Sequence, residues 1–248
     1  AIGASLALWN CHLDVFKQVV RDTFSKKPNV IDTNLQAAEA GYNYTNERYP
    51  SPDHCPFTFD ASKPQLLITG NEAIALGAIA GGCKFYCAYP MTPSSSVLHY
   101  MAGHDEEYGI VVKHAEDEIS VINMALGASF AGTRSMIGTS GGGFALMTEA
   151  LGLSGITETP LVILEAQRGG PATGLPTWTE QSDLRFVLHA AQGEFPRIVL
   201  TPGDVEEAFY LSAQAFNLAE KYQLPVIILS DKYLSENNNT CEPFDTNK

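Results

Sequence analysis

RSMIGTSGGGFALMTEALGLSGITETPLVILEA, residues 134–166, contains two short β-rich runs with a helical window between them. The runs Arg134–Thr139 and Leu161–Ala166 are typical of β-strands. The same alternation, punctuated by Gly, Pro and Ser, extends from about residue 64 to the closing part of the chain. Five further strand candidates are Leu66–Thr69, Lys84–Ala88, Ile110–Lys113, Ile198–Thr201 and Val226–Ser230. Several runs are continuously apolar, which predicts an α/β fold with a parallel sheet flanked by helices on both faces.

Three helices of this region have recognisable starts. Asp204 can cap one helix, with Glu207 completing a capping box, and this helix ends before Pro225. A second helix is predicted at Glu116–Ala131, with small residues on one face, and a third opens at Asn71. Such helices suit a sheet that is covered closely on both sides.

The first sixty residues have a different pattern. Helices are predicted at Leu13–Phe24 and Asn34–Ala40, a β-like stretch at residues 30–32, and a Pro-rich linker at residues 46–64. Two helices cannot bury a core alone, so this segment is expected to be the tail of another domain. The predicted domains are residues 1–60 (tail and linker), 61–236 (α/β domain) and 237–248 (polar tail or start of a further domain).

The composition excludes several classes of protein. The 248 residues are 45% hydrophobic and carry a formal net charge of −13, with no cluster of Lys and Arg that would bind nucleic acid. The sequence contains no run of 18 apolar residues, so no membrane-spanning helix is predicted. Five cysteines without a CxxC pair favour a reduced, cytoplasmic protein, and Cys83 and Cys87 are expected to be buried as small hydrophobes.

Ligand sites of parallel sheets lie beyond the carboxyl ends of the strands, so the loops there are the candidates for a binding site. In Ala88–Ser95, AYPMTPSS, two prolines fix the backbone and present Thr92, and Ser94–Ser96 can cap the following helix. Such a loop can aim a hydroxyl group at a ligand oxygen. The alternative is a plain Pro-rich turn with a helix cap.

The second loop contains three adjacent acids, Glu116, Asp117 and Glu118, after an apolar strand. Carboxylates are favoured in a first helical turn by the helix dipole, so a purely structural role is a strong alternative. The three side chains point in different directions, however. One of them is expected to face inward, towards a ligand.

The third loop, Gln167–Thr177, is rich in Gly and Pro and holds Arg168 directly after a strand. Its guanidinium can bind a carboxylate or phosphate through paired donors, although an arginine on a flexible surface loop is the alternative. A fourth loop, Thr139–Phe144, offers backbone amides at a helix start. It matches neither GxGxxG with a later acid nor GxxxxGK[ST], which disfavours dinucleotide and P-loop sites.

Four segments together carry a family resemblance: GNEAIALGAIAGGCKFYCAYPMTPSS, HAEDEISVINMALGASFAG, TSGGGFALMTEALGLSGITETPLVILEAQRGGPATGLPT and LAEKYQLPVIILSDKYL. They closely resemble the α subunit of 2-oxoacid:ferredoxin oxidoreductases, most of all the 2-oxoglutarate type, over about residues 65–235. Residues 14–45 are similar to the last portion of the γ domain, which some members fuse ahead of the α subunit.

The resemblance implies a domain that binds the aminopyrimidine ring of thiamine diphosphate. The family's activating glutamate then falls on Glu118, with Glu116 as the alternative, while Thr92 and Arg168 would grip the carboxylate of a 2-oxoacid. Met91 replaces the isoleucine of many relatives, a change of similar volume. Further cofactor contacts are expected at Tyr89, Pro90, Ser140, Gly141 and Gly142.

A partner is implied by what is missing. The family holds Mg²⁺ and the diphosphate with a GDG motif on a β subunit, which also carries an iron–sulfur cluster, and this sequence has no GDG. Gly203–Asp204 followed by Asn237–Asn239 mimics the spacing, but the third residue is Val205. The implied reaction is oxidative decarboxylation of a 2-oxoacid to acyl-CoA, with coenzyme A as co-substrate and ferredoxin as electron acceptor.

Two alternatives stay open at this point. The domain could be a non-catalytic module that binds a nucleotide or an acyl group, with the acids and the arginine as caps and surface charges. It could also belong to another thiamine enzyme, such as an indolepyruvate-type oxidoreductase, although the RGGPATGLPT loop favours the 2-oxoglutarate type.

Overall fold

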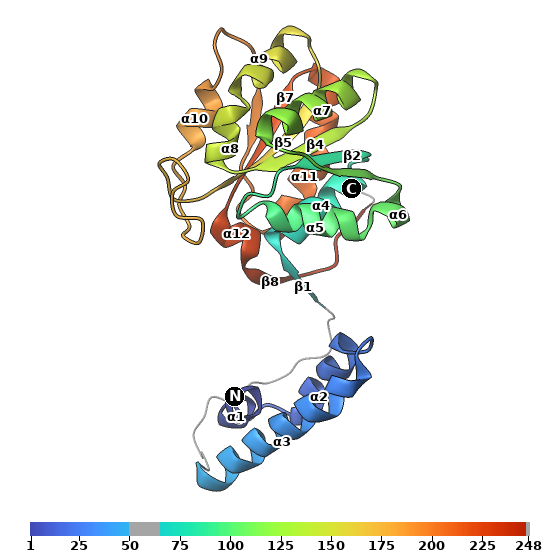
Figure 1. Cartoon of the computed structure of the whole chain (residues 1–248), viewed down its shortest axis with the longest axis vertical. Helices are drawn as coiled ribbons and strands as arrows, with labels where there is room; N and C mark the ends of the chain where they lie inside the picture. The colour runs from blue at the N-terminus through green and yellow to red at the C-terminus, as the bar shows by residue number, and fades with distance from the viewer. Residues whose placement is uncertain (50–64, 247–248) are drawn as a thin grey trace. The chain divides into compact units, whose positions relative to one another are not determined.

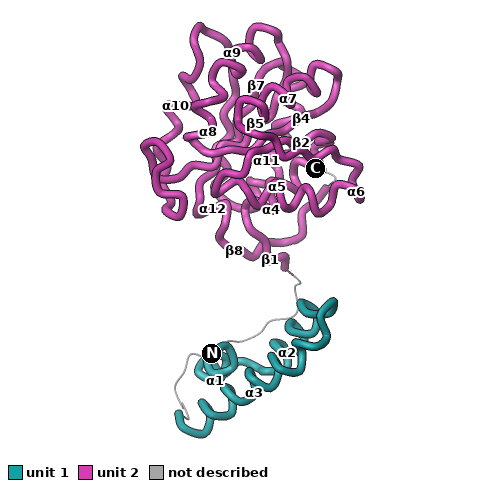
Figure 2. Tube along the Cα trace, in the orientation of Figure 1, with its two compact units in different colours: residues 1–63 teal, residues 64–248 magenta. Residues whose placement is uncertain are grey.

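The computed structural model describes residues 1–49 and 65–246 of the chain. They belong to two compact units, residues 1–63 and residues 64–248, which Figure 2 shows in separate colours. Most of the segment expected to be a linker, residues 46–64, lies outside the described residues.

In its described part, the first unit consists of helices alone: α1 (Ile2–Leu8), α2 (Leu13–Thr23), the short 3₁₀ helix η1 (Pro28–Val30) and α3 (Ile31–Arg48). The β-like stretch predicted at residues 30–32 is wrong. Val30 closes η1 and Ile31 begins α3, because Pro28 fixes a helical φ at the first position of the turn. The helix predicted at Asn34–Ala40 is longer and includes the first residues of the expected linker.

The second unit contains a six-stranded parallel sheet with the strand order β3-β2-β4-β5-β7-β6. Its strands are β2 (Phe85–Ala88), β3 (Val111–His114), β4 (Ser135–Thr139), β5 (Leu161–Gln167), β6 (Ile198–Leu200) and β7 (Pro225–Asp231). All neighbouring pairs are parallel. The predicted α/β fold is confirmed, and six of the seven predicted strands belong to this sheet.

Helices cover both faces of the sheet (Figure 1). One face packs against α4 (Gly70–Ala80), α5 (Ser95–Gly103) and α11 (Val205–Tyr222), and the other against α7 (Glu118–Phe130), α8 (Gly141–Leu146), α9 (Thr148–Ile156) and α10 (Leu184–His189). Successive strand residues alternate between the two cores: Val162 and Leu164 point to the first and Ile163 to the second. Both faces of the sheet are therefore buried from solvent, as the continuously apolar runs predicted.

The predicted start of α11 is largely confirmed. Asp204 accepts a hydrogen bond from the Glu207 amide over 2.8 Å, so it is a helix cap. The capping box is incomplete, because the Glu207 carboxylate accepts from Gly203 N rather than from Asp204 N.

Two other helices begin one or two residues away from their predicted starts. The cap of α4 is Thr69, which forms a full capping box with Glu72, so the helix begins before Asn71. Asp117 caps α7 through the amide of Ser120, which makes Glu118 the first helical residue.

The strand predicted at Leu66–Thr69 does not join the parallel sheet. This strand, β1, pairs antiparallel with β8 (Asn238–Cys241) in a separate two-stranded sheet. Leu67 is 71% exposed, so β1 lacks the cover on both faces that the parallel strands have. The segment expected to be a polar tail contributes β8. Two short helices complete the unit, α6 (Asp105–Tyr108) and α12 (Lys232–Glu236).

The two cysteines of the CKFYC segment are buried free thiols, as predicted. Burial raises the pKa of Cys83 to about 12 and that of Cys87 to about 11, so both pack as neutral groups. No helix in the described part of the chain is long and apolar enough to cross a membrane.

Candidate active site

A cavity of about 540 Å³ lies beyond the carboxyl ends of four adjacent strands. The loops after β2, β4 and β5 and the start of α7, which follows β3, all contribute to its wall. Parallel strands bring these loops to one edge of the sheet although they are far apart in the sequence. Five predicted site residues line the cavity: Tyr89, Glu118, Gly141, Gly142 and Arg168.

Three predicted residues, Pro90, Thr92 and Ser140, are not part of the cavity wall. Pro90 is exposed, whereas the Ser140 side chain is fully buried and its hydroxyl group has no hydrogen-bond partner among residues 65–246. The wall also includes Met91 and Asp183, which the sequence had not assigned to a site.

The three adjacent acids have three different environments. Glu116 is exposed, and Asp117 is the helix cap, where hydrogen bonding from Ser120 lowers its pKa. Glu118 is only 4% exposed and lies on the cavity wall, and its Oε1 has no hydrogen-bond partner in the described structure. A buried carboxyl oxygen without a partner is costly, which makes Glu118 the member of the trio that is set up to bind something in the cavity.

The glycine turn after β4, Gly141–Gly143, packs closely against the carboxyl groups of Glu118 and Asp183. A Cβ on Gly143 would overlap Thr139 Oγ1 and lie 2.8 Å from Glu118 Oε1, and a Cβ on Gly141 would lie 2.5 Å from Asp183 Oδ2. Only glycine leaves room at these positions for Glu118 on one side and Asp183 on the other.

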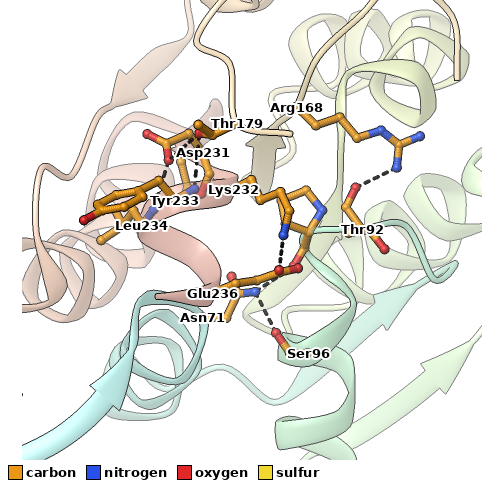
Figure 3. Close-up of polar contacts among 12 residues, drawn as sticks. Asn71, Thr92, Ser96, Arg168, Thr179, Asp231, Lys232, Tyr233, Leu234 and Glu236 are labelled. Atoms are coloured by element: carbon orange, nitrogen blue, oxygen red, sulfur yellow. Dashed lines mark hydrogen bonds and ion pairs between the residues drawn. The ribbon is translucent and has the colours of Figure 1, made fainter. Parts of the chain in front are cut away.

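Arg168 joins the loop after β5 to the loop after β2 (Figure 3). Its Nη1 donates to the backbone carbonyl of Thr92 over 2.7 Å and its Nη2 to that of Thr173 over 2.8 Å. The side chain forms no ion pair with a carboxylate in the described part of the chain, and it is 8% exposed. Since a guanidinium has five N–H donors, several are left for a ligand after these two bonds.

The loop that carries Thr92 is held from below by Asn71, which the sequence had not assigned to the site. The fully buried Asn71 side chain donates through Nδ2 to the Pro93 carbonyl and to Ser96 Oγ, both over 2.7 Å. Ser94 is the N-cap residue of α5, as predicted, but its side chain does not cap the helix, because Ser94 Oγ donates to the Met91 carbonyl. Ser96 Oγ accepts from Asn71. These serines stabilise the loop rather than the helix.

The long loop after β5 is also fixed at its far end. Asp231, at the end of β7, accepts a hydrogen bond from Gln181 Nε2 over 2.6 Å. It also accepts one from the Leu234 amide over 2.9 Å (Figure 3). Thr179 Oγ1 lies 3.5 Å from the same carboxylate. Arg168 fixes the start of this loop and Asp231 of β7 fixes its far part, so the loop forms an ordered wall of the cavity.

Several known proteins are similar to this chain. Residues 76–248 match the family described as pyruvate flavodoxin/ferredoxin oxidoreductase, thiamine diphosphate-binding. Subunit alpha of 2-oxoacid:ferredoxin oxidoreductase 1 from Sulfurisphaera tokodaii is 49% identical over 254 residues, which cover 96% of this chain and 39% of that protein. The 2-oxoglutarate synthase subunit KorA from Archaeoglobus fulgidus is 45% identical, with 67% of this chain and 48% of that subunit covered.

A solved structure extends the similarity to three dimensions. The 2-oxoglutarate:ferredoxin oxidoreductase from Magnetococcus marinus, solved with 2-oxoglutarate, coenzyme A and succinyl-CoA bound, is 41% identical and superposes with a TM-score of 0.91. The alignment covers 99% of this chain and 43% of that one. The chain thus spans less than half the length of the relatives described here.

Proposed function

This chain belongs to the pyruvate flavodoxin/ferredoxin oxidoreductase, thiamine-diphosphate-binding family, and from this premise we propose that residues 61–236 hold the aminopyrimidine half of thiamine diphosphate beside Glu118. The observation that carries the proposal is the buried Oε1 of the cavity-lining Glu118, which has no hydrogen-bond partner among the described residues. A pyrimidine ring nitrogen would supply that partner.

The cavity suits such a ring in shape as well as in chemistry. Gly141 and Gly142 lie on its wall without side chains, and Tyr89 and Met91 provide apolar surface beside them. These residues would hold the ring, with Pro90 and Ser140 as the neighbouring cofactor contacts proposed from the sequence. When bound, thiamine diphosphate supplies the carbanion that adds to a substrate carbonyl and accepts the electrons released by decarboxylation.

We assign the substrate carboxylate to Arg168, which lines the cavity, and to the hydroxyl group of Thr92, which lies outside the cavity wall on the loop that Arg168 contacts. Arg168 already makes two hydrogen bonds to backbone carbonyls, which fix its guanidinium plane before a substrate arrives. A charged donor that is held in this way can orient a 2-oxoacid without a large entropic cost. The proposed reaction is oxidative decarboxylation of a 2-oxoacid, with 2-oxoglutarate as the first candidate, to acyl-CoA.

The reaction needs groups that this sequence lacks. We propose that a β subunit supplies the GDG motif for Mg²⁺ and the diphosphate together with an iron–sulfur cluster, that coenzyme A takes the acyl group, and that ferredoxin takes the electrons. We further propose that residues 1–60 are the tail of a γ domain. A cytoplasmic location fits the free thiols of Cys83 and Cys87.

The test uses the full-length subunit in complex with its partner and compares Glu118→Gln with Glu116→Gln. Both variants remove one carboxylate, but only Glu118 lies on the cavity wall. We expect Glu118→Gln to lower thiamine-dependent dye reduction by 2-oxoglutarate on the order of 10²-fold or more, with Glu116→Gln unchanged. Normal turnover of the Glu118 variant, or no binding of thiamine diphosphate by the wild-type complex, would overturn the proposal.

A further inference from the structure

Glu165 is a fully buried acid in the centre of the sheet. It lies near the carboxyl end of β5, in register with Thr139 of β4 and Leu229 of β7, and its exposed fraction is 0%. Neither of its carboxyl oxygens has a hydrogen-bond donor among the described residues. An ionised carboxylate in such a place is very costly, so burial favours the protonated form of Glu165.

The group that lies within its reach is the carboxyl group of Asp183. Burial, and after it the negative charge of Asp183, raises the pKa of Glu165 well above its ordinary value. Burial also raises the pKa of Asp183, with a further contribution from Glu180, while the hydrogen bond with Glu165 acts in the opposite direction. A protonated Glu165 that donates to the Asp183 carboxylate would favour the protonated form of Glu165 and the ionised form of Asp183, so the raised pKa of Asp183 comes from its burial.

Asp183, unlike Glu165, lines the cavity. Its amide donates to Gln167 Oε1 over 2.9 Å, which fixes its backbone, and its Oδ2 fills the space beside Gly141. The charged residues of the cavity wall are Glu118, Arg168 and Asp183. A carboxylate ligand bound by Arg168 would therefore enter a cavity that already holds two acids.

We propose that Asp183 takes up a proton from solvent when a carboxylate-bearing ligand enters the cavity, and that protonated Glu165 is the positioning residue that holds the Asp183 carboxyl group against the glycine turn. The inference rests on the proposed function and names a second acid of the same site. The proton turns a repelling carboxylate into a hydrogen-bond donor for the ligand.

The surroundings of Asp183 favour this uptake. Glu165 faces it from β5, Glu118 shares the cavity wall from α7, and Glu180 lies against Gly169 in the same loop. The nearby cation is Arg168, which is already bound to Thr92 and Thr173. Strand β4 and helix α8 carry no ionisable side chain, and Arg185 of α10 is exposed. A new negative charge in the cavity therefore acts mainly on Asp183 and Glu118.

The probe is glutarate, a dicarboxylate that has no 2-oxo group and is not decarboxylated. Its binding to the complete, thiamine-loaded enzyme is measured by calorimetry at one pH in buffers with different ionisation enthalpies, which gives the number of protons taken up. We expect about one proton per glutarate in the wild type and none in Asp183→Asn. Asp105→Asn, a matched change away from the cavity, should leave the uptake at the wild-type value.

Two variants of Glu165 separate positioning from a general structural role. Glu165→Gln keeps a donor for Asp183 and should retain the uptake. Glu165→Leu removes the donor, which destabilises ionised Asp183, so the affinity for glutarate should begin to fall at a higher pH than in the wild type. Equal effects of the two variants would overturn the positioning role.

Failure of this inference is distinguishable from failure of the proposed function. Two results would overturn only the role of Asp183: glutarate binding without proton uptake in the wild type, or proton uptake that persists in Asp183→Asn. In both cases Glu118→Gln would still abolish thiamine-dependent turnover. Failure of glutarate to bind to an enzyme that turns over 2-oxoglutarate would overturn the role of Asp183 as well. A Glu118 variant with normal turnover would instead sink the function from which the inference starts.

Discussion

The guanidinium of Arg168 donates to the backbone carbonyl of Thr92 over 2.7 Å and thereby links the loop after β5 to the loop after β2. Strand β4 lies between β2 and β5 in the sheet. The hydrogen bond therefore links the loops on either side of Gly141 and Gly142, which follow β4. A single side chain thus sets the separation of the two loops that form opposite walls of the cavity.

Replacing Arg168 by Lys should weaken substrate binding even though the charge is kept. Lysine cannot reproduce the planar fork that binds Thr92 and Thr173 while leaving donors for a ligand. A lost hydrogen bond from a charged group corresponds to about 1.5–3 kcal/mol, or on the order of 10- to 100-fold in KM for the 2-oxoacid. Steady-state kinetics of the complex test this, with Arg185→Lys on the exposed side of α10 as the control. An unchanged KM would contradict the assignment.

Asn71→Asp should loosen the loop that carries Thr92. The substitution keeps the shape of the side chain but replaces the Nδ2 donor to Pro93 O and Ser96 Oγ by an acceptor. We expect a loss of about 1–3 kcal/mol in the free energy of unfolding of the full-length subunit in urea. The matched change Asn123→Asp concerns an exposed side chain of α7 and should stay within about 0.5 kcal/mol of the wild type. Equal stabilities of the two variants would mean that Asn71 does not anchor the loop.

Two helical glycines should respond to alanine in opposite ways. At Gly143 a Cβ would overlap Thr139 Oγ1 and lie 2.7 Å from Glu118 Cγ, whereas nothing lies within 4 Å of a Cβ at Gly127. We expect Gly143→Ala to destabilise the subunit by about 1–3 kcal/mol and to displace Glu118, with loss of thiamine-dependent activity. Gly127→Ala should stabilise the exposed part of α7 by about 0.5–1 kcal/mol. Urea denaturation and dye reduction measure the two effects, and full activity of Gly143→Ala would refute the close packing.

The stability of the subunit should depend on pH through Glu165. Its folded-state pKa lies well above the ordinary value of 4.5, so between these two values the folded chain binds a proton that the unfolded chain has lost. The contribution of Glu165 to the free energy of unfolding is therefore fully present below pH 4.5, and it is lost as the pH rises through this window. Glu165→Gln should reduce the decline and leave the part that comes from the raised pKa of Asp183, and its advantage over the wild type should grow with pH.

The control for this pH dependence is the exposed Glu116→Gln, whose unfolding free energy should run parallel to that of the wild type. Urea midpoints at a series of pH values give both curves. If Glu165→Gln and the wild type kept a constant difference at all pH values, Glu165 would not be protonated by burial.

Much of the fold could be predicted because apolar runs report burial on both faces. The strands β5 and β7 are buried along their whole length, and both were recognisable as predominantly apolar segments. The run Leu66–Thr69 has the same composition but lies in a small antiparallel pair, with Leu67 largely exposed. Composition alone does not distinguish these two environments, since pairing partners are decided by tertiary contacts.

Residues of the candidate site were predictable where they follow a strand closely in the sequence. They were not predictable where they lie inside a helix, inside a strand or far along a loop. Glu118 and Arg168 follow β3 and β5 closely, and both reach the cavity wall. Asn71 acts from a helix, and its signal was a polar residue at the start of an otherwise apolar segment. Glu165 carried a stronger signal, an acid inside the run LVILEAQ, but its partner Asp183 is brought to it only by the folded loop.

The pairing of β1 with β8 has a consequence for how the second unit can be handled. Leu66 and Cys241 are register partners, so the first and last strands of this unit lie side by side, and the residues after Cys241 stay on the unit because Phe244 stacks on Phe209. A short peptide joining these two strands would close the unit into a ring, and new termini could then be opened at an exposed turn far from the cavity. The unit therefore has the geometry of a cassette that can be inserted into, or removed from, a longer polypeptide without moving its sheet.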